Sequence, residues 1–368
     1  MAAAESFREH DADTPVRILT ADADLPYARP PLSKEYLRGQ ADDVALHQVQ
    51  WFDDRAIEIT CGAAVDRLDL AGRAVYAGEE RHAFDTVILA CGAAPTAPTF
   101  PGGERALLLR SLADAAALRN ASINAASAVV IGSGFIGCEA AASLALRGVP
   151  VTLVAPEPLP QEKRLGTDAA KRLRDLVSEA GARHVGGVTV EEINDVGVRL
   201  DDGVTIDSDL VLAATGVTPQ SRIAAEAGLA VRDSRIVVDS GMATSAPDVY
   251  AAGDVALARH EVAGRHLVIE HWQDAVDQGS IAGSCAAASP TKWSGVPGFW
   301  TSIGDATLKY HAWGDGYERS RMVQHRDGFT VWYESGDVAV GVLTYNADDD
   351  YGLGERLIAE RRPAPVPT

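Results

Sequence analysis

Several short runs of apolar residues stand out along the chain. The clearest is Ala-Val-Val-Ile at residues 128–131, where no polar residue alternates with the apolar ones. Such an unbroken run predicts a strand buried on both faces, as in a parallel sheet. An Ala-rich segment follows to about Arg147 and predicts a helix. Further strands are expected at residues 16–19, 87–90, 150–154 and 210–214, and further helices at 168–180 and 272–288.

The pattern changes near both ends of the chain. Residues 1–14 favour a helix and its exit, whereas the proline-rich segment 25–34 is expected to form no regular structure, since proline lacks an N–H and restricts its predecessor. After Pro290, short runs separated by Gly and Asp turns predict an antiparallel sheet. Its strands are expected at residues 308–313, 321–325, 329–333 and 338–343, with a last helix near 352–361.

Composition narrows the function classes. The chain has 368 residues and a net charge of -19, with no long basic run, so we expect no nucleic-acid partner. Its four cysteines are too far apart in sequence for a CxxC or CxxxxC pair, which argues against a metal site and a short-range redox disulfide. Without a signal peptide or an apolar run of membrane length, the sequence predicts a soluble cytoplasmic protein with no membrane partner.

The strongest motif is Gly132-x-Gly134-x-x-Gly137, between the 128–131 strand and the Ala-rich helix. The first glycine permits a tight turn, the second lets the backbone approach a pyrophosphate, and the third lets the helix pack on the strand. Phosphates then lie at the helix N-terminus, where free N–H groups and the macrodipole favour anions. In this context the motif predicts dinucleotide binding.

The adenosine end of this unit is less regular. An acid is expected about 20 residues further on, to accept a hydrogen bond from a ribose hydroxyl. The strand ends here at Ala155, and Glu157 could take that role after a small loop shift. Lys163 and Arg164 could instead bind a 2′-phosphate, so NADH and NADPH both remain open.

A second motif ends a strand with Tyr250-Ala-Ala-Gly-Asp254. It leaves the Asp254 carboxylate at the carboxyl edge of the predicted sheet, where ligands bind in open α/β folds. A carboxylate at this edge can accept a hydrogen bond from a ribityl hydroxyl, although Gly-Asp alone is also a common turn.

Four motifs together resemble the ferredoxin-reductase group of pyridine-nucleotide-dependent flavoproteins, in order and spacing. They are Leu25-Pro-Tyr-x-Arg-Pro-Pro-Leu-Ser-Lys34, the glycine loop at 132–137 with Glu139, the strand ending at Asp254, and Glu270-His-Trp272. The group includes putidaredoxin and rubredoxin reductases and the reductases of aromatic-ring dioxygenases. The resemblance implies that FAD and NAD(P)H are the cofactors and that a small iron–sulfur protein, a ferredoxin, accepts the electrons.

The resemblance also implies residue roles. Lys34 would lie near flavin N5 and pair with Glu139, and we take these two as the catalytic candidates. A helix beginning at Trp272 would point at the pyrimidine edge of the flavin, where its N-terminus would stabilise negative charge on the reduced ring. The FAD contacts implied by the resemblance are Asp22 at the adenosine ribose, Arg29, Lys34, Val65, Arg110, Asp254 at the ribityl chain, Trp272 and Trp300.

The chain departs from the family pattern in three places. Family members open with a strand and a Gly-x-Gly-x-x-Gly loop that holds the FAD pyrophosphate, whereas residues 1–7 here align with the helix after that loop. We therefore expect the first strand and loop to be missing, through either a start site set too far downstream or a real truncation. Cys91-Gly92 replaces Thr-Gly, with little expected effect. Residues 301–304 replace Ser-Asp-Gln-Tyr, which leaves the acceptor open.

The predicted fold class is α/β, with two Rossmann-like nucleotide-binding domains and a C-terminal α+β reductase domain. The expected division is an FAD-binding domain at 1–110 and 233–289, an NAD(P)-binding domain at 111–232, and the C-terminal domain at 290–368. The leading hypothesis is an FAD-dependent NAD(P)H:ferredoxin-type oxidoreductase. The alternatives are a reductase acting on a quinone or other small acceptor, and a truncated homologue that binds NAD(P) without catalysis.

Overall fold

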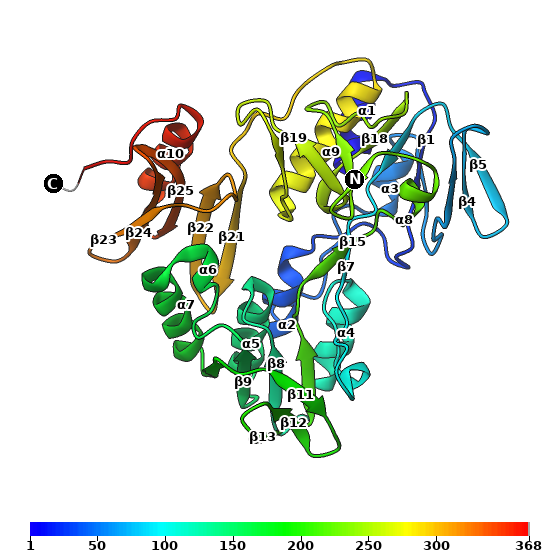
Figure 1. The fold of residues 1–368 in the computed structure, drawn as a ribbon. Helices are drawn as coiled ribbons and strands as arrows, with labels where there is room; N and C mark the ends of the chain where they lie inside the picture. The colour runs from blue at the N-terminus through cyan, green and yellow to red at the C-terminus, as the bar shows by residue number, and fades with distance from the viewer. Residues whose placement is uncertain (367–368) are drawn as a thin grey trace.

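The computed structural model describes residues 1–366 of the chain. A four-stranded parallel sheet occupies the lower part of Figure 1, with the strand order β10-β9-β8-β14. Strands β9 and β10 follow one another on one side of β8, and β14 lies on its other side, so the strand order reverses at β8. The strands are β8 (Ala128–Ile131), β9 (Val151–Ala155), β10 (Ala182–Gly186) and β14 (Leu210–Ala213).

Helix α5 (Phe135–Leu146) follows β8 and packs against this sheet. Its small side chains let it lie close to the strands, and Ala140, Ala141 and Ala142 are fully buried. The other elements around this sheet are α4 (Leu112–Ala121), α6 (Glu162–Leu165), α7 (Thr167–Glu179) and the antiparallel strands β11 (Val190–Ile193), β12 (Gly197–Leu200) and β13 (Thr205–Asp207).

Two separate parallel strand pairs lie at the upper right of Figure 1. Strand β1 (Val16–Leu19) pairs with β2 (Ile57–Thr60), and β6 (Val87–Leu89) pairs with β18 (Val249–Ala251). The second pair joins segments that are more than a hundred residues apart in sequence. The other strands of this part of the chain form smaller sheets, in which all pairs are antiparallel except the parallel pair of β17 and β19. They are β3 (Arg67–Asp69), β4 (Ala74–Ala77), β5 (Glu80–Ala83), β7 (Ala93–Pro95), β15 (Val217–Pro219), β16 (Val231–Arg232), β17 (Arg235–Val238), β19 (Ala256–Arg259) and β20 (His266–Leu267).

The first helix, α1 (Ala2–His10), lies against α9 (Trp272–Ala286). Glycine makes this close approach possible, because a side chain on Gly283 would collide with the carbonyl of Ala3. A buried hydrogen bond of 2.7 Å between the Ser6 and Ser284 hydroxyls adds a polar contact. The shorter helices of the chain are η1 (Pro30–Ser33), α2 (Glu35–Arg38), α3 (Val49–Asp53), η2 (Gly103–Arg105), α8 (Arg222–Glu226) and η3 (Gly253–Val255).

The C-terminal part is a five-stranded antiparallel sheet covered by α10 (Asp348–Ala359). It lies at the left of Figure 1, beside the helices of the parallel sheet. Its core includes Phe329 and Tyr333, which are almost completely buried. The strands are β21 (Gly298–Ile303), β22 (Ala306–Ala312), β23 (Arg319–Gln324), β24 (Phe329–Ser335) and β25 (Val338–Tyr345).

Three local predictions from the sequence need correction. The segment 25–34 contains the short helix η1, because proline is well tolerated in the first turn of a helix. The sequence did not predict strand β21, because its polar residues Thr301 and Ser302 interrupt the apolar pattern. Pairing with β22 stabilises this strand. Helix α10 begins at Asp348 rather than near residue 352, and three aspartates in its first turn suit the helix dipole.

None of the helices within residues 1–366 combines the length and the apolar character needed to cross a lipid bilayer.

Candidate functional site

The glycine loop lies at the carboxyl end of β8, where the strand order reverses. Gly132 has a φ of +102°, and a side chain there would collide with the carbonyl of Ala214, which follows β14. A side chain on Gly137 would collide with the carbonyl of Gly132, so the missing Cβ lets α5 approach the strand. Crevices at such reversal points are where open α/β sheets bind ligands.

Gly134 differs from the other two glycines of the loop. It is the N-cap of α5 with a φ of -65°, which other residues adopt readily. The nearest atom to a Cβ built there is Nε2 of Gln161, at 3.8 Å. The space above Gly134 is therefore open, and the first N–H groups of α5 face it without a side-chain cap. This arrangement suits an anion such as a pyrophosphate.

A buried ion pair lies on the next turn of the same helix. Glu139 Oε2 is 2.8 Å from the Lys34 ammonium, and both side chains are less than a tenth exposed. Lys34 also donates to the carbonyl of Pro30 at 2.9 Å. Since an unpaired charge is costly in a buried environment, each of these two residues requires the other.

Two hydroxyl groups complete the surroundings of the Glu139 carboxylate. Ser33 donates to Oε2 at 2.5 Å, and Thr301 of β21 donates to Oε1 at 2.6 Å. Ser143, one turn further along α5, donates to the carbonyl of Ser33 at 2.7 Å. Glu139 thereby joins α5, the segment around Lys34 and the C-terminal sheet through charge-assisted hydrogen bonds.

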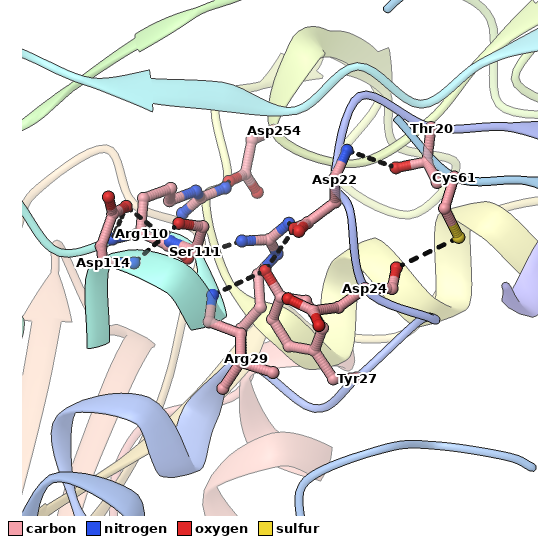
Figure 2. A network of polar contacts seen from close by, with 11 residues as sticks. Thr20, Asp22, Asp24, Tyr27, Arg29, Cys61, Arg110, Ser111, Asp114 and Asp254 are labelled. Carbon is pink, nitrogen blue, oxygen red and sulfur yellow. Dashed lines mark hydrogen bonds and ion pairs between the residues drawn. The ribbon is translucent and has the colours of Figure 1, made fainter. Parts of the chain in front are cut away.

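A second polar network, shown in Figure 2, connects four of the residues implicated by the sequence. Arg110 Nη2 is 2.6 Å from Asp254 Oδ2, and the carbonyl of Arg110 accepts a 2.5 Å hydrogen bond from Arg29. Arg29 in turn lies 3.8 Å from the Asp22 carboxylate. The network thus brings together residues from the Pro-Pro segment, the start of α4 and the end of β18.

Tyr27 closes this network at Asp22. Its hydroxyl donates to Asp22 Oδ2 at 2.5 Å and accepts from the backbone N–H of Leu112 at 2.9 Å. Burial, together with the hydrogen bond to Asp22, raises the pKa of Tyr27 to about 12. The hydroxyl therefore keeps its proton at neutral pH and holds the Asp22 carboxylate in place.

A capping box fixes the start of α4 beside Arg110. The Ser111 hydroxyl accepts from the N–H of Asp114, and the Asp114 carboxylate accepts from the N–H groups of Arg110 and Ser111. These hydrogen bonds satisfy N–H groups that a helix leaves free at its N-terminus. They hold the backbone from which Arg110 reaches Asp254.

The remaining candidates take no part in either network. Within residues 1–366, no side-chain hydrogen bond or ion pair involves Val65, Glu157, Trp272 or Trp300. Trp272 is the first residue of α9, and Val65 packs on the core around β6 and β18. Trp300 is 41% exposed on β21, between the buried Phe299 and Thr301. Glu157 follows the end of β9, where its carbonyl accepts from Gly187.

Sequence reasoning assigned no role to Tyr27, Ser33 or Thr301. Tyr27 and Ser33 lie inside the Leu25-to-Lys34 motif, so their position in it was a usable signal. Thr301 offered none, because it reaches Glu139 across 162 residues of sequence.

The fold and these networks define a class of protein. The class is an α/β protein with a glycine loop of the dinucleotide-binding type, in which a buried ion pair lies on the helix that follows this loop.

A family model described as pyridine nucleotide-disulphide oxidoreductase matches residues 1–279. This chain belongs to that family.

The relatives include rhodocoxin reductase of Rhodococcus erythropolis, which is 30% identical over 98% of this chain and 87% of its own length. A rubredoxin-NAD(+) reductase of Pseudomonas putida is 31% identical over 80% of this chain and 79% of its own length. A chain from the crystal structure of a covalent putidaredoxin reductase–putidaredoxin complex has a TM-score of 0.93 at 26% identity, covering 98% of this chain and 91% of that one.

These comparisons confirm the α/β fold class and the resemblance to ferredoxin reductases that the sequence motifs indicated.

The ion pair can be tested with a double-mutant cycle. Glu139→Leu is expected to lower the free energy of unfolding by about 3–5 kcal/mol, because it leaves the Lys34 ammonium buried without a partner. The double variant Lys34→Met, Glu139→Leu removes both charges and is expected to recover most of that loss. Urea unfolding of the parent, both single variants and the double variant measures this. A double variant less stable than Glu139→Leu would contradict the account.

Proposed function

We propose that this chain is an FAD-dependent NAD(P)H oxidoreductase of the ferredoxin-reductase type, which passes electrons to a small iron–sulfur protein. One observation carries the proposal: the helix that begins at the open Gly134 position also carries Glu139 and, through it, Lys34. A nucleotide bound at the start of α5 would therefore lie one turn from the ion pair.

The residues of the Figure 2 network suit FAD. Asp254 is 8% exposed, and Arg110 holds one of its carboxylate oxygens, which leaves the other available to a ribityl hydroxyl. Asp22 is held by Tyr27 for a ribose hydroxyl, and Arg29 would supply positive charge near the phosphates. Val65, Trp272 and Trp300 are proposed as further contacts with the flavin half of FAD.

When bound, the flavin supplies the chemistry that accepts two electrons as a hydride and releases them one at a time. Lys34 and Glu139 would fix the wall of the pocket and hold an ammonium proton donor at a set position. The first N–H groups of α9 at Trp272 would favour negative charge on a reduced ring.

For NAD(P)H we propose the loop formed by Gly132, Gly134 and Gly137. Glu157, two residues beyond the end of β9, is our candidate for the adenosine ribose. Because the nicotinamide and the flavin must meet in one orientation for hydride transfer, the rigid turn at Gly132 would contribute by positioning the dinucleotide.

We also propose the domain division expected from the sequence: 1–110 with 233–289 for FAD, 111–232 for NAD(P), and a C-terminal domain from 290 onward. Strand β6 pairs directly with β18, although the four-stranded parallel sheet lies between them in sequence, and this pairing supports the discontinuous first domain. A cytoplasmic location is proposed because NAD(P)H, the proposed electron donor, is an intracellular metabolite.

The acceptor is the part of the proposal that an assay can decide. All four cysteines are free, so this chain has no redox disulfide that could take electrons from the flavin, which favours a separate electron acceptor. With FAD supplied, we expect NAD(P)H-dependent reduction of a [2Fe–2S] ferredoxin, followed through cytochrome c, to have a higher kcat/KM than reduction of a water-soluble quinone. Faster quinone reduction would instead indicate a quinone reductase, and no turnover with either acceptor would refute the proposed activity.

The role of Gly134 can be separated from its effect on folding. Gly134→Ala should leave the melting temperature nearly unchanged, because the Cβ meets no atom closer than 3.8 Å and the φ of -65° suits alanine. The methyl group would occupy the space proposed for the pyrophosphate, so we expect KM for NAD(P)H to rise about tenfold.

Gly137→Ala is the matched control for this experiment. Its Cβ would collide with the Gly132 carbonyl, so it should lower the melting temperature as well as nucleotide affinity. An unchanged KM in Gly134→Ala would show that the dinucleotide binds elsewhere.

A further inference from the structure

A basic pocket lies outside both networks, where three helices end. It is a cavity of about 450 Å³. Its lining includes Arg38 in the last turn of α2, Arg119 near the end of α4, and Arg147 at the C-cap of α5. Asp42 is the one acidic residue in the lining, and its side chain is 84% exposed. In a chain with a net charge of -19, this is an unusual concentration of positive charge.

Two of the guanidinium groups lie side by side. Arg147 Nη1 is 3.1 Å and Arg119 Nη2 is 3.4 Å from the point where a side chain on Gly39 would begin. Gly39 has a φ of +79°, so the backbone there favours glycine, and the absence of a side chain leaves room for both groups. Two like charges this close repel each other, and an anion between them would relieve that repulsion.

The protein holds both arginines in place before any ligand binds. Arg147 donates from Nε to the Ser122 hydroxyl at 3.0 Å and from Nη1 to the carbonyl of Leu37 at 3.2 Å. The Arg119 guanidinium lies over the ring of Tyr36, 5.2 Å from its centroid, as in a cation–π pair, and Arg119 Nη2 is 2.8 Å from Asp42 Oδ1. Because the side chains are already ordered, little further entropy is lost on binding.

The simplest alternative is that these arginines only neutralise helix C-termini. Cations are favourable there, and the carbonyls of Leu37 and Ala41 do accept from Arg147 and Arg119. Each guanidinium carries five N–H groups, however, and these contacts use only some of them. Arg147 Nη2 has no hydrogen-bond partner among residues 1–366, so donors remain for a ligand.

We propose that this pocket binds a small, multiply charged anion of the phosphate type, either free or as part of a phosphorylated metabolite. Arg119 and Arg147 would supply the principal contacts, since paired guanidinium groups match phosphate oxygens geometrically. The site is distinct from the glycine loop at the opposite, N-terminal end of α5.

The test is a calorimetric titration of the purified full chain with inorganic phosphate and with pyrophosphate, each without and with saturating NAD⁺. Pyrophosphate could also enter the glycine loop, and NAD⁺ is present to block that route. We expect binding that persists with NAD⁺. Arg119→Gln and Arg147→Gln should each weaken it about tenfold or more, through loss of charge-assisted hydrogen bonds.

Two further variants keep the result decisive. Asp42→Asn removes an exposed carboxylate that competes for Arg119, so it should tighten anion binding several-fold without threatening the fold. Arg222→Gln, an exposed arginine paired with Glu226 on α8, is the control and should leave binding unchanged. Binding that NAD⁺ abolishes, or equal affinity in the parent, Arg119→Gln and Asp42→Asn, would overturn the proposal.

Discussion

A carboxylate that is buried away from water requires hydrogen-bond donors or a cation from the protein, and in this protein the Glu139 carboxylate imposes that requirement on three segments of the chain. Its oxygens accept hydrogen bonds from Ser33, Lys34 and Thr301. Glu139 itself lies on α5, Ser33 and Lys34 lie in the segment that follows the two prolines, and Thr301 lies in the C-terminal sheet. Since breaking a buried ion pair costs far more than the pair contributes, the three segments are held in one arrangement.

The same helix links this constraint to nucleotide binding. Its first turn begins at Gly134 with free N–H groups, and its second turn carries Glu139. The packing that places the helix depends on Gly132 and Gly137, where any side chain would meet a backbone carbonyl. A dinucleotide at the helix start and a flavin beside Lys34 would therefore be positioned by one rigid element rather than by two independent ones.

Much of this could be predicted from sequence where the signal is local. The run at 128–131 and the glycine spacing predicted the strand and the loop, because both depend on neighbouring residues. The Lys34–Glu139 pair came only through family resemblance. Thr301 as a third partner could not be predicted, since its strand, β21, depends on pairing with β22. Helix η1 was missed because two prolines were taken as breakers, although a first turn accepts them.

In the proposed enzyme, nicotinamide and flavin meet beside the buried ion pair. Anaerobic stopped-flow absorbance of the FAD-loaded chain mixed with NADH or NADPH tests this most directly. We expect complete loss of the oxidised-flavin absorption with at least one of the two nucleotides, and a rate of flavin reduction about tenfold or more lower in Lys34→Met at saturating nucleotide. Oxidised flavin that persists with both nucleotides, or an unchanged rate in Lys34→Met, would contradict it.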